Sequence, residues 1–264
     1  MQKVVMVDQD GVVVDTQYQV TQNVTDIVAS FRQQGLIIVP NSDTPVQRLK
    51  KNIADWLGFA PEVTIGEKGA VISNRGACTF VKNVTGIGEY IRALQNTLAR
   101  HGASVHAGDS ATWIRERKTF PSGQRLLIVD ALRQQSIGFY LLVSDSMGAT
   151  HIDVDWSNEA IAAITQLSLP AGLEPLDYNQ SYGIAIAHAS GVTKTDGYRV
   201  IRGVFGDVLY YMVGDQLADF IDDPCVTHCA VGNATDGYKD RAAFIATADY
   251  TAGLAECLRW IAEQ

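Results

Sequence analysis

The chain has 264 residues, of which 47% are hydrophobic and 19% charged, a composition typical of a globular protein with a sizeable core. Its formal net charge is −8, and no basic run or stripe stands out, which argues against a nucleic-acid partner. No stretch approaches the roughly 18 apolar residues of a membrane span. The N-terminal apolar run is too short for a signal peptide, so we expect a cytoplasmic location and no membrane partner.

The four cysteines are expected to be reduced thiols, because disulfides are rare in a reducing compartment. They are Cys78, Cys225, Cys229 and Cys257. The segment 224–229, PCVTHC, places two of them beside His228, but no second Cys or His pair lies nearby. We therefore do not expect a zinc site.

The first 80 residues alternate between strand and helix patterns. Residues 3–8 predict an apolar strand, and the amphipathic stretch 21–35 predicts a helix that ends at Gly35. Residues 36–40 are hydrophobic throughout, as in a parallel strand buried on both faces. A helix over 44–58, with Pro45 in its first turn, precedes two short strands near 62–65 and 69–73.

The middle of the chain has a different pattern, which predicts a small α+β unit inserted into the first fold. Its expected elements are a helix over 86–102, strands near 103–107 and 111–117, a helix near 123–135, and strands over 137–144 and 150–156. From about residue 182 the alternation resumes, with strands over 182–188, 208–215 and 226–233 and helices over 193–206 and 251–263. We therefore expect one α/β domain, 1–83 and 184–264, divided by the insertion 84–183.

Polar and charged residues follow the predicted strands of the α/β domain. Asp8 and Asp10 follow the first strand, Asn41-Ser42-Asp43 the second, Lys194 lies shortly after a third, and Asp215 ends a fourth. Ligands of parallel sheets bind beyond the carboxyl ends of the strands. Clustered carboxylates repel one another unless a cation lies among them, and oxygen ligands favour Mg²⁺. Since Mg²⁺ commonly pairs with phosphate, the pattern indicates phosphoryl chemistry.

Four ordered motifs resemble those of the haloacid dehalogenase (HAD) superfamily of aspartate-dependent phosphatases. They are DQDGVVVDT (8–16), PNSDTP (40–45), the downstream Lys194, and VGDQLADFIDD (213–223). The insertion resembles the α/β cap of Cof-like sugar phosphatases. The resemblance implies a Rossmann-like core with a parallel sheet, plus an inserted α+β cap domain that selects the substrate and closes over the core.

The resemblance also implies a role for each motif residue. Asp8 would be the nucleophile that forms an aspartyl-phosphate, and Asp10 the general acid and base. Asp8, the Asp10 backbone carbonyl and Asp215 would bind Mg²⁺, and Asp219 would be a further ligand or would contact one. Ser42, with Asn41 beside it, would bind substrate phosphoryl oxygens, and Lys194 would neutralise developing charge. In the cap, Arg115 and Arg117 are candidate phosphate-binding residues.

Some positions depart from the family pattern or leave alternatives open. Asp43-Thr44 stands where Gly-Arg is common, and Ala218 replaces a usual Asn in the fourth motif. Asn233 would lie near the site or only serve a turn. Several charged residues could have a structural role instead of a functional one. Asp15 could cap a helix, and Asp222 and Asp223 could form a solvated turn. The Arg115/Arg117/Lys118 group could be a solvated face, and Asp153 and Asp155 could lie on the outer face of a strand.

The leading hypothesis is a Mg²⁺-dependent phosphatase that hydrolyses a small phosphorylated metabolite, with a sugar phosphate favoured. A phosphohexomutase of the same fold is the nearest alternative, and a non-catalytic HAD-like binding protein is the alternative from another class. A mutase needs more phosphate-binding arginines in its cap than this sequence offers, and a non-catalytic relative would be expected to lose Asp8, Asp10 or Asp215. A monomer and a homodimer remain equally open.

Overall fold

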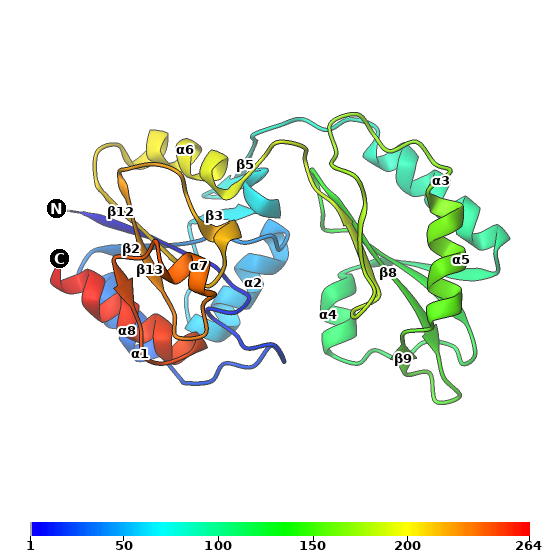
Figure 1. Cartoon of the computed structure of the whole chain (residues 1–264), viewed down its shortest axis with the longest axis horizontal. Coiled ribbons are helices and arrows are strands. Elements are labelled where there is room, and N and C mark those ends of the chain that lie inside the picture. The colour runs from blue at the N-terminus through cyan, green and yellow to red at the C-terminus, as the bar shows by residue number, and fades with distance from the viewer. Residues whose placement is uncertain (1) are drawn as a thin grey trace. The chain divides into compact units, whose positions relative to one another are not determined.

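The computed structural model describes residues 2–264, which form two compact units (Figure 1). The first unit combines residues 2–81 with Val192–Gln264, and the second is Lys82–Gly191. None of the helices over residues 2–264 is long and apolar enough to span a bilayer. The predicted fold class, α/β with a parallel sheet and an additional α+β unit, is confirmed.

The first unit is built on a five-stranded parallel sheet in the order β14-β13-β12-β1-β2. Its strands are β1 (Lys3–Val7), β2 (Leu36–Pro40), β12 (Leu209–Gly214), β13 (Val226–Ala230) and β14 (Phe244–Ile245). Side chains of β1 alternate between two hydrophobic clusters, with Val5 and Val7 in one and Val4 and Met6 in the other. The continuous apolar run of β1 therefore reflects a strand that is buried on both faces.

Helices cover both faces of this sheet. They are α1 (Thr25–Gln33), α2 (Val46–Leu57), α6 (Lys194–Phe205), α7 (Asp236–Lys239) and α8 (Tyr250–Glu263). Apolar residues of α1, α2 and α8 join the cluster that contains Val5, whereas Tyr198 and Ile201 of α6 join the cluster that contains Val4. Helix α2 ends at Gly58, whose left-handed φ of 75° gives the C-cap its conformation.

A small antiparallel sheet, β3 (Val63–Gly66), β4 (Val71–Asn74) and β5 (Ala77–Phe80), follows α2. A single parallel bridge between Asn41 and Ile65 links it to the end of β2. The Ser42 amide also donates to the Ile65 carbonyl, at 3.0 Å. These two links hold the loop after β2 at the carboxyl edge of the parallel sheet.

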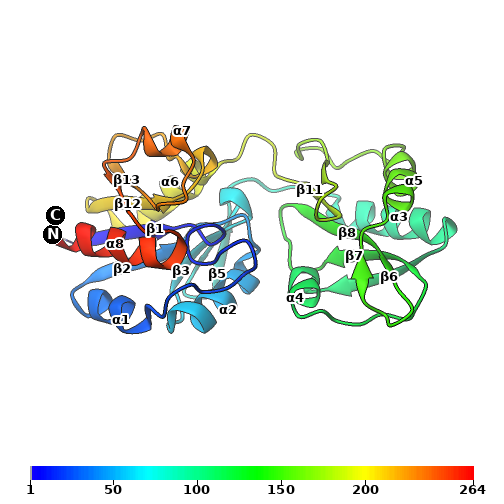
Figure 2. The same cartoon turned by 60° about the horizontal axis from the view of Figure 1, so that its bottom comes forward.

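The second unit contains a mostly antiparallel sheet in the order β10-β11-β8-β7-β6, with β9 beside β8. Its elements are α3 (Ile87–Arg100), β6 (Ala103–Gly108), α4 (Ser110–Arg115), β7 (Arg125–Asp130), β8 (Ile137–Ser144), β9 (Thr150–His151), α5 (Val154–Ile164), β10 (Asp177–Asn179) and β11 (Ile184–Ala187). Figure 2 shows α3 and α5 together on one face of this sheet, where Leu94, Leu98 and Trp156 are buried. Phe120 and Tyr140 belong to a second cluster, which also includes residues of α4.

Three sequence-based predictions in this unit are wrong. The helix expected near 123–135 is instead strand β7, because the short run after Arg125, LLIVD, is buried throughout and periodicity does not separate such a strand from a helix. The strand expected near 111–117 is helix α4, which the Asp109 carboxylate caps at the Thr112 amide. The strand expected over 150–156 stops at His151, and Asp153 caps α5 by accepting from the Trp156 amide at 2.8 Å.

The position of one strand also differs from expectation. Residues 182–188 were expected to resume the alternation of the first unit, but β11 pairs antiparallel with β8 of the second. The register places Ala185 opposite Phe139 and Ala187 opposite Ile137, which buries both alanines. An isolated apolar strand pattern gives no information about its partner, and here the partner is a strand 40 to 50 residues earlier.

Candidate active site

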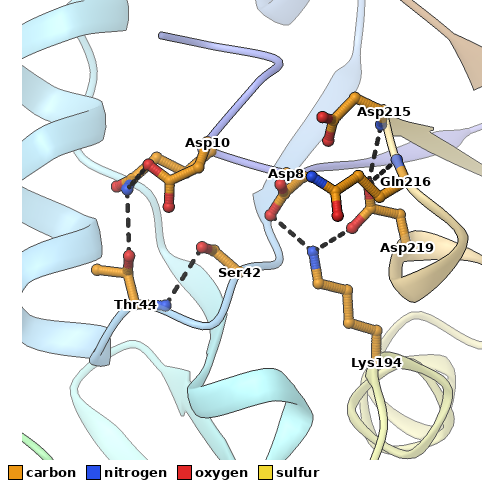
Figure 3. A network of polar contacts seen from close by, with 9 residues as sticks. Asp8, Asp10, Ser42, Thr44, Lys194, Asp215, Gln216 and Asp219 are labelled. Carbon is orange, nitrogen blue, oxygen red and sulfur yellow. Dashed lines mark hydrogen bonds and ion pairs between the residues drawn. The ribbon is translucent and has the colours of Figure 1, made fainter. Parts of the chain in front are cut away.

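The charged residues after β1 and β12 lie together because these parallel strands are neighbours in register. Val7 pairs with Val213, and the Asp8 amide donates to the Val213 carbonyl at 3.1 Å. Asp8 and Asp215 therefore leave the sheet at the same edge, as Figure 3 shows. The predicted convergence of strand ends is thus observed for β1 and β12.

Lys194 forms two short ion pairs at this edge. Its Nζ lies 2.6 Å from Oδ1 of Asp8 and 2.6 Å from Oδ1 of Asp219. It is the first residue of α6, whose start is set by a capping box between Thr193 and Asp196. Only 5% of the Lys194 side chain is exposed, and burial alone would lower its pKa. Asp219 and Asp8 outweigh that effect and raise the pKa, so the ammonium stays charged.

Asp219 is held by contacts on both carboxylate oxygens. While Oδ1 accepts from Lys194, Oδ2 accepts from the backbone amides of Asp215 at 2.9 Å and Gln216 at 3.1 Å. The residue ends a 3₁₀ turn over Leu217–Asp219, directly after the end of β12. Asp219 is therefore placed to orient Lys194.

Three buried carboxylates at this edge fit a hard divalent cation. One oxygen each from Asp8, Asp215 and Asp219 lies within 4.8 Å of the others. Burial, with the nearby Asp219 carboxylate adding to it, raises the pKa of Asp215 to about 7. Burial likewise raises the pKa of Asp8, where Lys194 opposes the shift and Asp219 adds to it. One ammonium does not compensate three buried carboxylates, and an all-oxygen donor set is the one that Mg²⁺ prefers.

The backbone after Asp8 turns sharply around Asp215. Gly11 has a φ of +82°, and a Cβ at this position would lie 2.3 Å from Oδ2 of Asp215. Both facts require glycine, the first through backbone strain and the second through a steric clash. Asn233 holds the same turn, because its Nδ2 donates to the Gly11 carbonyl and its Oδ1 accepts from the Tyr250 amide, both at 2.8 Å. Asn233 therefore lies near the candidate site, because it contacts the Asp10-Gly11 loop.

Ser42 lies in the loop after β2, on the opposite side of Asp8 from Lys194 (Figure 3). Its Oγ accepts from the Thr44 amide at 3.2 Å, so the hydroxyl proton remains available to a ligand. Asn41 is fully buried, and neither atom of its side-chain amide has a hydrogen-bond partner among residues 2–264. Its backbone amide donates to the Val7 carbonyl at 2.8 Å. A contact of Asn41 with substrate stays a prediction.

No protein-family model matches this sequence, and a comparison with curated proteins finds no match. Solved structures do match over nearly the whole chain. A haloacid dehalogenase-like hydrolase from Bacteroides thetaiotaomicron is 15% identical, with a TM-score of 0.68 over 99% of this chain and 100% of that one. The chain has the haloacid dehalogenase-like fold.

Two further HAD structures agree. A HAD/COF-like hydrolase from Plasmodium vivax is 15% identical, with a TM-score of 0.62 over 98% of this chain and 95% of that one. A HAD subclass IIB sugar phosphatase is 14% identical, with a TM-score of 0.58 over 98% of this chain and 99% of the other. At these identities the likeness concerns the fold.

Sequence reasoning assigned no role to three residues of this candidate site, namely Gln9, Thr44 and Asn52. Gln9 is buried between the two aspartates, and its Nε2 lies 3.1 Å from both Asp10 Oδ1 and Thr44 Oγ1. Asn52 of α2 donates to Gln9 Oε1 at 2.8 Å. The available signal was an amide residue at the end of an otherwise apolar strand, where burial requires hydrogen-bond partners.

The remaining predicted residues lie elsewhere. Arg115 ends α4 and Arg117 follows it with a φ of 53°, both in the second unit, so their role toward phosphate stays a prediction. Asp15 serves a turn, because its Oδ1 accepts from the amides of Gln17 and Gln19. Asp223 is also structural, since it accepts from the Cys225 amide and pairs with Arg202.

Proposed function

We propose that this protein is a Mg²⁺-dependent phosphatase that hydrolyses a small phosphorylated metabolite through an aspartyl-phosphate on Asp8. The observation that carries the proposal is the buried ammonium of Lys194, which lies 2.6 Å from Asp8 within a cluster of three carboxylates. A charged group at that distance orients a nucleophilic carboxylate and offsets the charge of an incoming phosphoryl group. The neighbours with HAD folds include one described as a sugar phosphatase.

The first half-reaction uses the two aspartates of the DQD motif. A carboxylate oxygen of Asp8 attacks phosphorus, and the bond between phosphorus and the alcohol oxygen breaks. Asp10 gives its proton to that oxygen, so the alcohol leaves neutral. Partial loss of water around the Asp10 carboxyl raises its pKa, with the Gln9 hydrogen bond opposing, which favours a carboxyl group that holds a proton before the reaction.

The second half-reaction regenerates the enzyme. Asp10, now a carboxylate, takes a proton from water, and the oxygen of that water attacks the phosphorus of the aspartyl-phosphate. The bond between phosphorus and Asp8 breaks, which releases phosphate and the Asp8 carboxylate. Lys194 stays paired with Asp8 and Asp219 and limits the charge that accumulates, while Ser42 donates its hydroxyl to a phosphoryl oxygen.

The metal-binding residues in this proposal are Asp8, the backbone carbonyl of Asp10, and Asp215, with Asp219 in contact with the others. The bound ion would neutralise the phosphoryl oxygens as the attacking carboxylate approaches. Asp219 already accepts from one ammonium and two amides, and its main task in this proposal is to hold Lys194.

We further propose that the second unit determines which phosphorylated metabolite is hydrolysed, and that the substrate is a sugar phosphate or a similar polyol phosphate. Arg115 and Arg117 are the cap cations assigned to it. If they bind substrate, R115A and R117A raise KM for the metabolite and leave the turnover of p-nitrophenyl phosphate unchanged.

The experiment that tests the activity compares the wild type with D8N on p-nitrophenyl phosphate, with and without Mg²⁺. Removal of the nucleophile should lower kcat by at least about 10³-fold, and removal of Mg²⁺ should do the same. D55N is the matched control, because it makes the same change at an exposed residue of α2 that pairs with Lys51. An inactive wild type, or D8N as active as D55N, contradicts the proposal. A screen of phosphorylated metabolites then identifies the substrate.

A further inference from the structure

We propose that Gln9 is a positioning residue, which holds the carboxyl group of Asp10 in the orientation needed for proton transfer. The inference rests on the function proposed above and goes beyond it, because Gln9 has no part in that chemistry. The feature behind it is the buried amide between the two aspartates, only 2% exposed and with three hydrogen bonds of its own.

The contacts of Gln9 determine which way its amide faces. Asn52 Nδ2 lies 2.8 Å from Gln9 Oε1, while Gln9 Nε2 lies 3.1 Å from Asp10 Oδ1. The opposite orientation would place the Gln9 oxygen against the Asp10 carboxylate that the first half-reaction leaves, and an ionised carboxylate only accepts hydrogen bonds. Asn52 is itself buried in α2, in a helix that packs through Leu49, Ile53 and Leu57. The donor that faces Asp10 is thus anchored to a rigid element.

This donor selects the oxygen of Asp10 that carries the proton. An N–H group that points at Oδ1 makes Oδ1 an acceptor, so the proton of the neutral carboxyl group resides on Oδ2. During the first half-reaction the Oδ2–H bond breaks as the proton moves to the leaving alcohol oxygen. During the second, Oδ2 accepts the proton of water. The Gln9 bond to Oδ1 persists through both steps and keeps the same oxygen available.

The same amide links Asp10 to the loop after β2. Gln9 Nε2 also donates to Thr44 Oγ1, and the Thr44 amide donates to Oγ of Ser42. The acid–base residue and the hydroxyl assigned to the phosphoryl group are therefore connected through the Gln9 side chain and then through the hydroxyl and backbone amide of Thr44. A displaced Gln9 would disturb Asp10 more directly than Ser42, because Gln9 contacts Asp10 itself but reaches Ser42 only through Thr44.

The test uses the dependence of kcat/KM on the leaving group, since kcat/KM reports the steps up to departure of the alcohol. p-Nitrophenol leaves readily without a proton, whereas phenol depends more on the general acid. Q9M keeps the length and apolar bulk of the side chain and removes both amide functions. We expect kcat/KM for p-nitrophenyl phosphate to change less than about threefold, and that for phenyl phosphate to fall about tenfold or more.

N52A is the second variant, because it removes the anchor of Gln9 and leaves Gln9 in place. We expect it to shift the ratio of the two substrates in the same direction as Q9M, and the double variant to resemble Q9M alone. T64V is the matched control, since it makes a shape-conserving polar-to-apolar change at another fully buried residue of the same unit. Thermal unfolding of each variant, followed by tryptophan fluorescence, confirms that the proteins compared are folded.

The outcomes separate this inference from the proposed function. An equal fall on both substrates, or an unchanged ratio in Q9M and in N52A, overturns the positioning role. A shift of the ratio in T64V overturns it as well, because any buried substitution would then produce the effect. A failure of the proposed function looks different, because the wild type would then be inactive or D8N fully active.

Discussion

Replacing Lys194 by methionine should destabilise the protein in a pH-dependent way as well as abolish its activity. The change removes the ammonium that lies 2.6 Å from both Asp8 and Asp219 and keeps the apolar part of the side chain. Both carboxylates remain buried, and neither has another cation within the same distance among residues 2–264.

The size of the effect follows from these distances. At an effective dielectric constant of about 20, each pair at 2.6 Å represents about 6 kcal/mol of Coulomb attraction. Desolvation of the buried ammonium offsets much of this, and breaking a buried pair by removing one partner costs about 3–5 kcal/mol. We therefore expect K194M to lose about 3–5 kcal/mol in the free energy of unfolding at about pH 8.

The loss should shrink as the pH falls. Lys194 lowers the pKa of Asp8, so its removal raises that pKa further above the ordinary value of 3.8. A carboxyl whose pKa is higher in the folded state binds more protons there, so its contribution to stability falls as pH rises above the ordinary value. The loss in the free energy of unfolding of K194M relative to the wild type is therefore larger near pH 8 than near pH 5, by about a factor of two or more.

Urea unfolding at these two pH values, followed by tryptophan fluorescence, measures the difference. K50M is the control, because Lys50 is partly buried and donates to the Ser73 hydroxyl rather than to a carboxylate. Its effect should stay within about 1 kcal/mol and be independent of pH. K194M with wild-type stability at pH 8, or with the same deficit at both pH values, would refute the electrostatic reasoning.

Three further predictions concern the first unit. His228 accepts from the Ile221 amide through Nε2, and burial lowers its pKa from 6.5 to about 4. The folded state then binds fewer protons than the unfolded state, so up to about 3 kcal/mol of stability is lost as the pH falls from 6.5 to about 4. A pH series of urea unfolding checks this, and a flat profile in that window contradicts it. G11A places a Cβ 2.3 Å from Asp215 Oδ2 and should lower kcat/KM by about 10²-fold, whereas an unchanged rate would show that the turn adapts. N233A removes the bond to the Gly11 carbonyl and should cost about 1–2 kcal/mol, measured by urea unfolding; no loss would mean that water replaces the amide.

Much of the first unit was predictable from local patterns. Strands β1, β2 and β12 are short and mostly apolar, and a polar residue follows each of them, whereas β13 mixes apolar residues with Thr227 and His228. Helices α2, α6 and α8 carry their apolar residues on one face. The convergence of Asp8 and Asp215 was predictable because parallel neighbours end at the same edge of a sheet. Lys194 was not predictable in this way, because it begins α6 and the strand before it, β11, pairs with β8 in the other sheet.

The second unit was less predictable, because its short segments have ambiguous patterns. Residues 126–129 are apolar throughout, and such a short run suits a buried strand as well as a helix turn. Asp153 was interpreted as a residue on a strand face, although an aspartate before a helix equally predicts an N-cap. Strand β11 has an apolar pattern that does not specify β8 as its partner.

The sequence by itself determined which chemical groups stand at the strand ends, and with them the kind of chemistry proposed. Only the tertiary structure decided that Lys194 bridges Asp8 and Asp219, that Asn233 holds the Gly11 carbonyl, and that Asn52 anchors Gln9. The physical reason is separation along the chain: Lys194 and Asp8 are 186 positions apart, and Asn52 and Gln9 are 43 apart. Local spacing contains no information about such contacts, which arise when burial forces polar groups to find partners.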